Sequence, residues 1–213
     1  MVDRFFDFVE QDQVKIRIMF TQNRHVPVGL TPYQQEHEYF MLYYQFLKHA
    51  FGWQHANISD AFIPLRLYLD RLPDEKAKVA QFRTFLEQLN DTEQFVNGRV
   101  YIKPDQIAEV SSHDHVILQC LDIVMGSMQF RLNDKHLDKV EGEGKRGRKT
   151  IAKDALYKQI GQRIRRIYPG FNIGISTGVQ DNLINRWQHP YRHWLFIPRD
   201  FELDATKHKP TKR

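Results

Sequence analysis

The chain has 213 residues, 41% of them hydrophobic and 27% charged, which predicts one folded domain or one domain with an appendage. Aromatic residues make up 13%, which excludes a mostly disordered chain, and no apolar run approaches the roughly 18–20 residues of a membrane-spanning helix. A single cysteine, Cys120, excludes an internal disulfide and a metal cage built from cysteines. Residues 1–10 are too charged for a signal peptide. We therefore expect a reducing, cytoplasmic setting and no membrane partner.

The net charge of +5 is unevenly distributed along the chain. Residues 1–130 contain 12 Lys and Arg against 17 Asp and Glu, whereas residues 131–213 contain 19 against 9. A basic C-terminal third predicts a polyanionic partner, and nucleic acid is the partner we expect. The alternatives are an acidic substrate, a membrane surface, or a solvated basic face with no ligand.

The first predicted elements are a short helix over residues 3–12 and a strand over residues 14–20. In the strand, apolar residues alternate with Lys, Arg and Met, which is typical of one buried face. The sequence Thr31-Pro32-Tyr33-Gln34 is a capping-box pattern with proline at the first helical position. It predicts a helix that runs to about Ala50 and packs its aromatic residues into the core.

Two further strands and two helices are predicted in the middle of the chain. Residues 62–69 form an apolar run that ends at Asp70, and Pro73-Asp74-Glu75 opens the helix that follows. Residues 99–103 predict a short strand that ends at a proline. Residues 114–132 predict a long helix, apolar around most of its circumference, which we expect to be buried.

The basic third begins with a charged, glycine-interrupted stretch over residues 134–150, for which the sequence predicts a mobile loop. A helix is expected over residues 151–167, strands over 171–176 and 193–197, and a frayed tail over 204–213. Strands that alternate with helices favour an α/β layered domain. The candidate nucleic-acid contacts in the loop are Lys145, Arg146, Arg148 and Lys149.

One face of the long helix is not apolar, because polar residues and a glycine recur at intervals of four, three, four and three: His115, Gln119, Asp122, Gly126 and Gln129. A carboxylate in a buried helix needs a partner. For Asp122 the alternatives are a buried arginine, a capping role for a neighbouring element, a metal ion, or acid–base chemistry. Gly126 is consistent with close approach of a backbone or a substrate, or with tight helix packing.

Asp70 is the second candidate carboxylate, because it is placed at the carboxyl edge of a strand, where α/β sheets gather ligands. The alternative is a turn in which Asp70 acts as a cap. A divalent cation shared by Asp70 and Asp122 would relieve the repulsion between them. No histidine spacing indicates zinc, Cys120 has the surroundings of an inert core residue, and no glycine-rich phosphate loop indicates an ATPase.

Residues 112–126 resemble a motif of the family catalogued as domain of unknown function 3800. The motif is a serine, Leu-Gln six residues later, Asp three after the Gln, and a small residue four after the Asp, which here are Ser112, Leu118, Gln119, Asp122 and Gly126. Residues 65–71 resemble the family's strand followed by an aspartate, and the resemblance covers residues 1–132.

The resemblance implies a ribonuclease H-like mixed sheet flanked by helices, with a basic C-terminal α+β extension. It implies a metal-dependent nuclease acting on DNA or RNA, in a defence or mobile-element context. Asp70 and Asp122 would hold Mg²⁺ or Mn²⁺ and carry the catalysis. Ser112, His115 and Gln119 would position the substrate.

The chain departs from that family in two places. The family often has an acidic residue before the motif serine and a lysine after it, where this chain has Ser111 and His113. The family begins with a strand that ends in Asp-Glu-Ser-Gly, and no such segment precedes Val14. We therefore expect a ribonuclease H-like core over residues 1–132 that is incomplete at its N-terminal side. A charged loop is expected over 133–150, a C-terminal helix with strands packed on the core over 151–203, and a basic tail over 204–213. The alternatives are a non-catalytic member of the same fold that binds nucleic acid or protein, and a chain completed by a homo-oligomer or a complementing partner.

Overall fold

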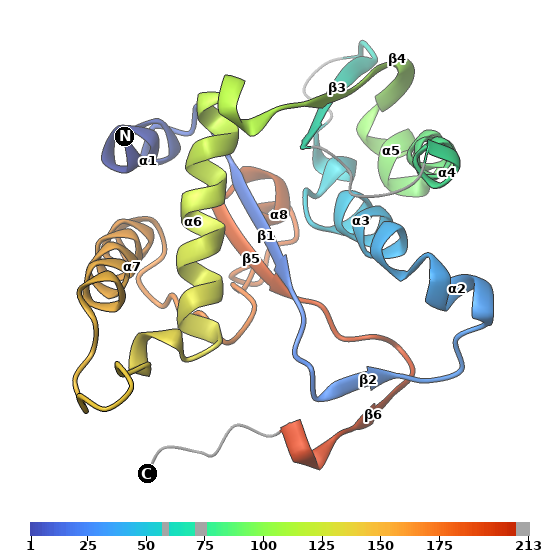
Figure 1. Ribbon diagram of the computed structural model, residues 1–213. Coiled ribbons are helices and arrows are strands. Elements are labelled where there is room, and N and C mark those ends of the chain that lie inside the picture. The colour runs from blue at the N-terminus through green and yellow to red at the C-terminus, as the bar shows by residue number, and fades with distance from the viewer. Residues whose placement is uncertain (57–59, 71–75, 208–213) are drawn as a thin grey trace.

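The computed structural model describes residues 1–56, 60–70 and 76–207, which fold into helices around three two-stranded sheets (Figure 1). The helices are α1 (Val2–Glu10), α2 (Pro32–Glu36), α3 (Glu38–His49), α4 (Lys76–Glu87), α5 (Glu93–Gly98), α6 (Val116–Leu132), α7 (Arg148–Ile167) and α8 (Asn185–Gln188). The strands are β1 (Ile16–Phe20), β2 (His25–Pro27), β3 (Ile63–Asp70), β4 (Val100–Val110), β5 (Tyr191–Leu195) and β6 (Phe201–Leu203). The predicted mixed α/β class is confirmed.

Two of the three sheets are parallel pairs. β1 pairs with β5, with Ile16 opposite Tyr191, and β3 pairs with β4, with Asp70 opposite Val110. A parallel pair needs a crossover connection, which α4 and α5 supply between β3 and β4. β2 and β6 form a short antiparallel pair. β5 thus completes a sheet with the first strand of the chain, although the two strands lie about 170 residues apart in the sequence.

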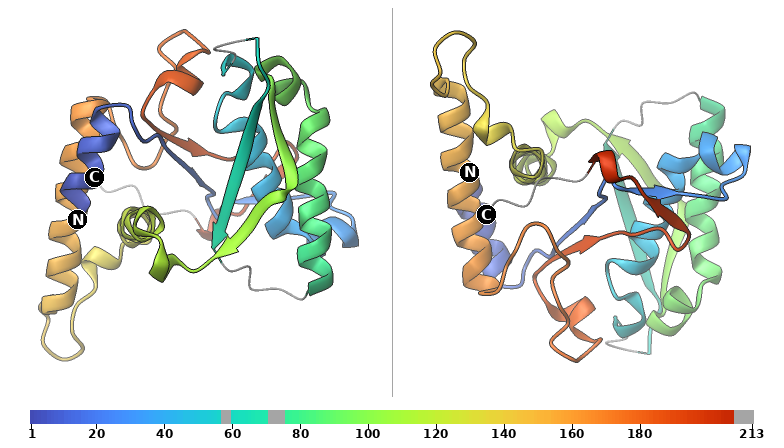
Figure 2. Two further views of the ribbon diagram at one scale, coloured as in Figure 1. Left: turned by 90° about the horizontal axis from the view of Figure 1, so that it is seen from above. Right: turned by 90° about the horizontal axis from the view of Figure 1, so that it is seen from below.

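Two separate hydrophobic cores hold these layers together. The first lies between the β1–β5 pair and the helices α1, α6 and α7, with Phe6, Ile16 and Tyr191 fully buried. The second lies between the β3–β4 pair and α3, α4 and α5, where Phe40 stacks on Phe82 with ring centroids 4.7 Å apart. Figure 2 shows α1 beside α7 on one flank and α4 beside β3 and β4 on the other.

Several predicted elements are confirmed, with ends that differ by at most two residues. The short helix forms as α1 and the long helix as α6. Thr31 forms the predicted capping box with Gln34, although the helix is interrupted at His37 and so becomes α2 and α3. Pro73-Asp74-Glu75 lies outside the described residues. Within the described part of the chain, no helix combines the length and the apolarity that crossing a bilayer requires.

Three predicted elements are wrong in extent or type. The strand expected to end at Pro104 continues through it, because β4 is an exposed edge at that point and its pairing with β3 is irregular between Leu65 and Leu67. Residues 171–176 form no strand and instead pack Phe171 into the first core. The strand expected over 193–197 begins two residues earlier, at Tyr191.

Candidate nucleic-acid interface and carboxylate edge

Asp70 is the last residue of β3, and its side chain lies at the surface. Its register partner is Val110, the last residue of β4, so the carboxyl ends of the two strands lie together. The chain then passes through a 3-10 turn, Ser112–Asp114, into α6. We call Asp70, Ser112, His115 and Gln119 the carboxylate edge.

The three predicted positioning residues follow one another at this edge. His115 precedes α6, and its ring lies 6.0 Å from the ring of Tyr68 on β3. The side-chain amide of Gln119 donates a hydrogen bond to the backbone oxygen of His113 at 2.8 Å. Tyr68 lies two residues before Asp70 on β3. Its contact with His115 therefore links the outer face of β3 to the start of α6.

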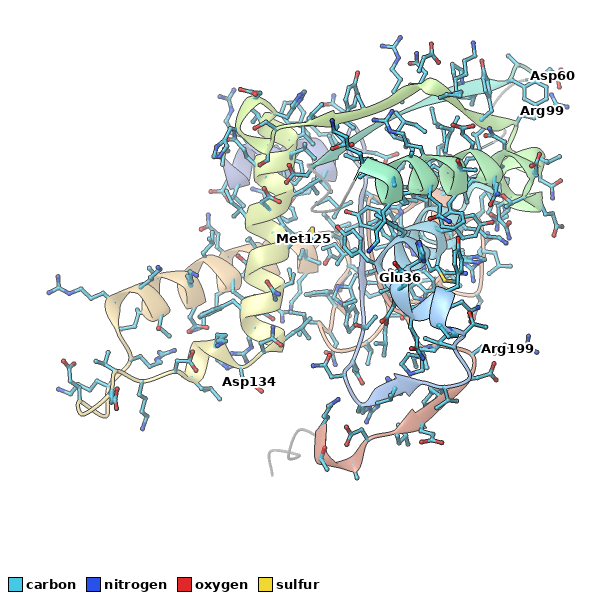
Figure 3. The ribbon with its side chains drawn as sticks, turned by 45° about the vertical axis from the view of Figure 1, so that its right-hand side comes forward. Glu36, Asp60, Arg99, Met125, Asp134 and Arg199 are labelled. Carbon is cyan, nitrogen blue, oxygen red and sulfur yellow. The ribbon has the colours of Figure 1, made fainter. Side chains whose placement is uncertain are left out.

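Asp122 does not have the buried setting that the sequence predicts. α6 is buried only along the face that packs on α1 and α7, at Cys120, Val124, Ser127 and Met128, and Asp122 lies on the opposite, exposed side. Met125, labelled in Figure 3, is 54% exposed on the same helix. Asp122 is exposed because α6 packs against other elements on one face only. The helix has more apolar residues than that face can bury. Asp122 consequently needs no buried partner, and no hydrogen bond or ion pair to it is found among the described residues.

Asp122 lies beyond the carboxylate edge along α6, three residues after Gln119. It follows His115 by seven residues, which is about 10 Å of helical rise. Gly126 lies one turn further on. Apart from its own helix backbone, no described residue has an atom within 4 Å of the position that a Cβ would occupy, so neither a packed backbone nor a close helix contact in the described chain explains this glycine. The described residues contain no group of three or more His, Cys, Asp or Glu side chains placed to hold one metal ion.

The predicted basic loop is partly helical. Arg148 and Lys149 are the first two residues of α7, and a turn closed by Val140 and Lys145 precedes them. Arg146 donates hydrogen bonds to the backbone oxygen of His136 and to the buried carboxylate of Asp154, and Lys158 contacts the same carboxylate. These cations hold the pKa of Asp154 below its usual range. Arg146 therefore has a structural contact, whereas Lys145, Arg148 and Lys149 are exposed.

A second basic site, which the sequence did not single out, lies on the other face of the β1–β5 pair. A cavity of about 440 Å³ is bounded by β1 and β5 on one side, by the end of α3 on the other, and by α8. Four arginines line it, namely Arg17, Arg186, Arg192 and Arg199, and no Asp or Glu of the described residues does. We call it the arginine cavity.

The charges of this cavity are not neutralised by the described part of the chain. None of the four arginines forms an ion pair there, and Asp12, whose carboxylate raises the pKa of Arg17, is itself paired with Lys15. The Arg17 side chain donates to the backbone oxygens of Ile16, Arg186 and Trp187, but its Nε has no partner among the described residues. The Nε of Arg192 is likewise buried and unpartnered within them.

The pKa values of three groups that line the arginine cavity are lowered, because the groups are buried and lie close to other cations. Burial, together with the neighbouring Arg192, lowers the pKa of Arg17 to about 10. Burial and the charge of Arg186 lower the pKa of Arg192. The same causes, burial first and then Lys48 and Arg186, lower the pKa of His49, which lines the cavity from α3. At neutral pH the arginines remain charged and His49 is a neutral hydrogen-bonding group.

The arginine cavity was missed because strand register is not visible in a sequence. Arg17 is on the strand face that the alternation assigns away from the core, and Arg192 is its register partner on a strand about 170 residues away. The only local signal is that both strands place arginine opposite their buried face. A scan against models of protein families, a search of curated proteins and a search of solved structures find no match to this chain.

Proposed function

We propose that this protein binds nucleic acid. The observation that carries the proposal is the arginine cavity, where four guanidinium groups that form no ion pair with the described residues line one space with the rings of Trp194 and Phe196. Guanidinium groups recognise phosphate through charge-assisted hydrogen bonds, and aromatic rings stack on bases of any sequence. A partner that carries both phosphates and flat rings matches this lining.

The start of α7 supports the same partner. Arg148 and Lys149 occupy the first turn of that helix, where the helix dipole disfavours positive charge. A phosphate bound near this turn would offset the unfavourable placement. The net positive charge of residues 131–213 adds a field that attracts polyanions.

The test is a binding titration with single-stranded DNA and RNA at several salt concentrations. The logarithm of the binding constant should fall linearly with the logarithm of salt, with a slope of about −0.7 for each phosphate neutralised. The variant Lys145→Gln/Arg148→Gln/Lys149→Gln should bind more weakly and with a shallower slope. Arg4→Gln, which removes an exposed charge on α1, is the matched control. Binding that ignores both salt and the triple variant would refute the proposal.

A second candidate function is metal-dependent hydrolysis of the phosphodiester backbone on a ribonuclease H-like fold. The observation that favours it is the carboxylate edge, because Asp70 ends a parallel strand beside β4, from which the chain runs directly into the helix of Asp122. Two carboxylates with water in the remaining positions are a donor set that suits Mg²⁺ or Mn²⁺. The ion would supply activation of a water molecule. Ser112, His115 and Gln119 would position the substrate.

This candidate is tested by incubating labelled DNA and RNA with the protein and Mn²⁺ or Mg²⁺. Cleavage should require the metal and should be abolished in Asp70→Asn and in Asp122→Asn. The control is Asp105→Asn, which removes an exposed carboxylate on β4 away from the carboxylate edge. Cleavage that continues in EDTA, or that survives both Asp variants, excludes the metal-dependent mechanism.

A further inference from the structure

The four arginines of the arginine cavity differ in how far they are exposed to solvent. Arg17 is buried, with 8% of its surface exposed, whereas Arg186 and Arg192 are half-buried. Arg199 is exposed and lies on the segment between β5 and β6, where Figure 3 labels it. We therefore take the buried Arg17 as the floor of the cavity and the exposed Arg199 as its mouth.

Charge at the floor distinguishes two kinds of phosphate. An internal phosphodiester carries one negative charge and continues as a strand in both directions. A phosphomonoester carries about 1.5 to 2 negative charges at neutral pH and continues in one direction only. Four guanidinium groups line the cavity with no carboxylate of the described residues among them, and this lining matches the more highly charged group that enters end first.

From this arrangement we infer that the arginine cavity binds a nucleotide by its phosphomonoester group. The inference rests on the proposed nucleic-acid binding and specifies which part of the partner this site holds. The phosphomonoester has two sources, which are the phosphorylated end of a strand and a free nucleotide. In both, the phosphate lies near Arg17 and Arg192, and Arg199 contacts the ligand at the mouth.

The base has a place in the same cavity. Trp194 lies on β5, with its ring edge-to-face with Phe196 at 5.5 Å and with His49 at 6.2 Å. All three side chains line the cavity. Trp194 follows Arg192 by two residues on β5, so the two side chains leave the same face of the strand and a base can stack beside its bound phosphate. The volume of about 440 Å³ lies within the range of small-ligand sites.

Arg17 is held in position before any ligand arrives. Its guanidinium donates to three backbone oxygens at 2.9–3.1 Å, two of which belong to Arg186 and Trp187 of α8. These oxygens fix the side chain without neutralising its charge. A phosphate therefore meets an ordered cation, and little side-chain entropy is lost on binding.

The experiment measures binding of three small probes by tryptophan fluorescence and calorimetry: inorganic phosphate, adenosine and adenosine monophosphate. The measurement with adenosine monophosphate is repeated on Arg199→Gln protein. Two oligonucleotides of one sequence are compared alongside, with phosphorylated ends and with hydroxyl ends. Adenosine monophosphate should bind at least about tenfold more tightly than adenosine or inorganic phosphate, since the site holds both parts of the nucleotide. The phosphorylated oligonucleotide should bind about tenfold more tightly than the hydroxyl one.

Variants distinguish the loss of a contact with the ligand from the loss of the folded structure. Arg199→Gln and Arg192→Gln should each weaken binding of adenosine monophosphate about tenfold, which is the typical effect of removing one charge-assisted contact. Arg199 is exposed, so its variant keeps the fold even if Arg192→Gln does not. Arg166→Gln, an exposed arginine on α7 outside the cavity, should change nothing. Trp194→Phe should remove most of the fluorescence change while leaving phosphate-dependent binding measurable by calorimetry.

The outcomes separate this inference from the proposed function. Equal affinity for the two oligonucleotides, with no binding of adenosine monophosphate, overturns the inference and leaves nucleic-acid binding in place. Binding of adenosine monophosphate without binding of either oligonucleotide supports the inference, assigns the free nucleotide as its source, and refutes the proposed function. Arg199→Gln protein that binds adenosine monophosphate like the wild type also overturns the inference.

Discussion

Arg17 on β1 and Arg192 on β5 are register partners in a parallel pair, so two guanidinium groups leave the same face of the sheet side by side. Like charges placed directly across two strands destabilise a sheet. Burial and the charge of Arg192 accordingly lower the pKa of Arg17 to about 10. The protein keeps this unfavourable pair although neither arginine forms an ion pair with a carboxylate of the described residues, which is why we place an anionic ligand there.

Because Asp122 is exposed, its substitution should change the chemistry of the site without changing the stability of the fold. Asp122→Asn should leave the free energy of unfolding within about 0.5 kcal/mol of the wild type, because the side chain is exposed on α6. Urea denaturation followed by circular dichroism measures this. A loss of more than about 2 kcal/mol would show that Asp122 has a structural partner. With stability unchanged, any loss of cleavage in this variant is chemical.

Two glycines should respond in opposite directions to alanine. At Gly98, the last residue of α5, an added Cβ would lie 2.0 Å from the backbone oxygen of Trp53, so Gly98→Ala should destabilise by about 2 kcal/mol or more. At Gly126, mid-helix in α6, nothing lies within 4 Å, so Gly126→Ala should stabilise by about 0.5–1 kcal/mol. Thermal melts of the pair compare the two. A destabilised Gly126→Ala would mean that a bound partner or a second copy approaches α6 at that point.

His193 should make the protein sensitive to mild acid. Its Nε2 lies 2.8 Å from the backbone oxygen of Ile173 and its Nδ1 lies 3.3 Å from the hydroxyl of Tyr191, and the neutral ring that donates from Nε2 satisfies both contacts. Burial lowers the pKa of His193 below its ordinary 6.5, although the contact with Ile173 opposes the shift. Below pH 6.5 the unfolded chain therefore binds a proton that the folded chain does not, and stability falls as the pH falls.

The measurement is the free energy of unfolding from neutral pH to about pH 5.5, above the range where carboxylates titrate. Wild-type protein should lose stability over this interval, and His193→Gln should start lower but lose less. His49 and His189, whose pKa values burial and nearby cations also lower, contribute in the same direction. His113→Gln, at an exposed position, is the control. A pH dependence that is unchanged in His193→Gln would contradict this assignment.

Arg163 should prove to be the anchor between α7 and α1. Its side chain is 10% exposed, and it contacts Asp7 at 2.5 Å and Glu10 at 2.8 Å, with Asp3 at 3.7 Å. Arg163→Ala should destabilise by about 1–2 kcal/mol, a range reduced from that of a buried pair because Asp7 is half-exposed. The exposed neighbour Arg166→Ala should change stability by less than about 0.5 kcal/mol in the same denaturation experiment.

Local patterns predicted the elements whose signals are complete within a few residues. The alternation of Ile16 and Ile18 identified β1, the Thr31 capping box identified the start of α2, and the apolar run before Asp70 identified β3. These succeed because a strand face or a helix cap is determined by neighbours in sequence. Pro104 misled because proline ends a strand only where its missing N–H is needed, and here it lies on an exposed stretch of β4.

Tertiary relationships were not accessible in the same way. A helix as apolar as α6 predicts burial all round, but the number of elements packed against it decides how much of it is covered, and that number is a property of the fold. The partner of Asp122 was inferred from a burial that does not occur. The arginine cavity depends on pairing β1 with β5, which no local pattern encodes. The sequence predicted only that Arg17 faces away from the core, and the other three arginines only contributed to the charge of the basic C-terminal third.

The two hydrophobic cores have no residue in common, and the arginine cavity lies where the elements of one face those of the other. A molecule built in this way is weakest along the seam between its halves. An anion bound between the two halves would hold them together, because it attracts the cations of β1, β5 and α8 and removes the repulsion between them. Binding of an anion in the arginine cavity would then stabilise the whole chain and slow the opening of both halves. The effect would not be limited to the side chains that contact the ligand.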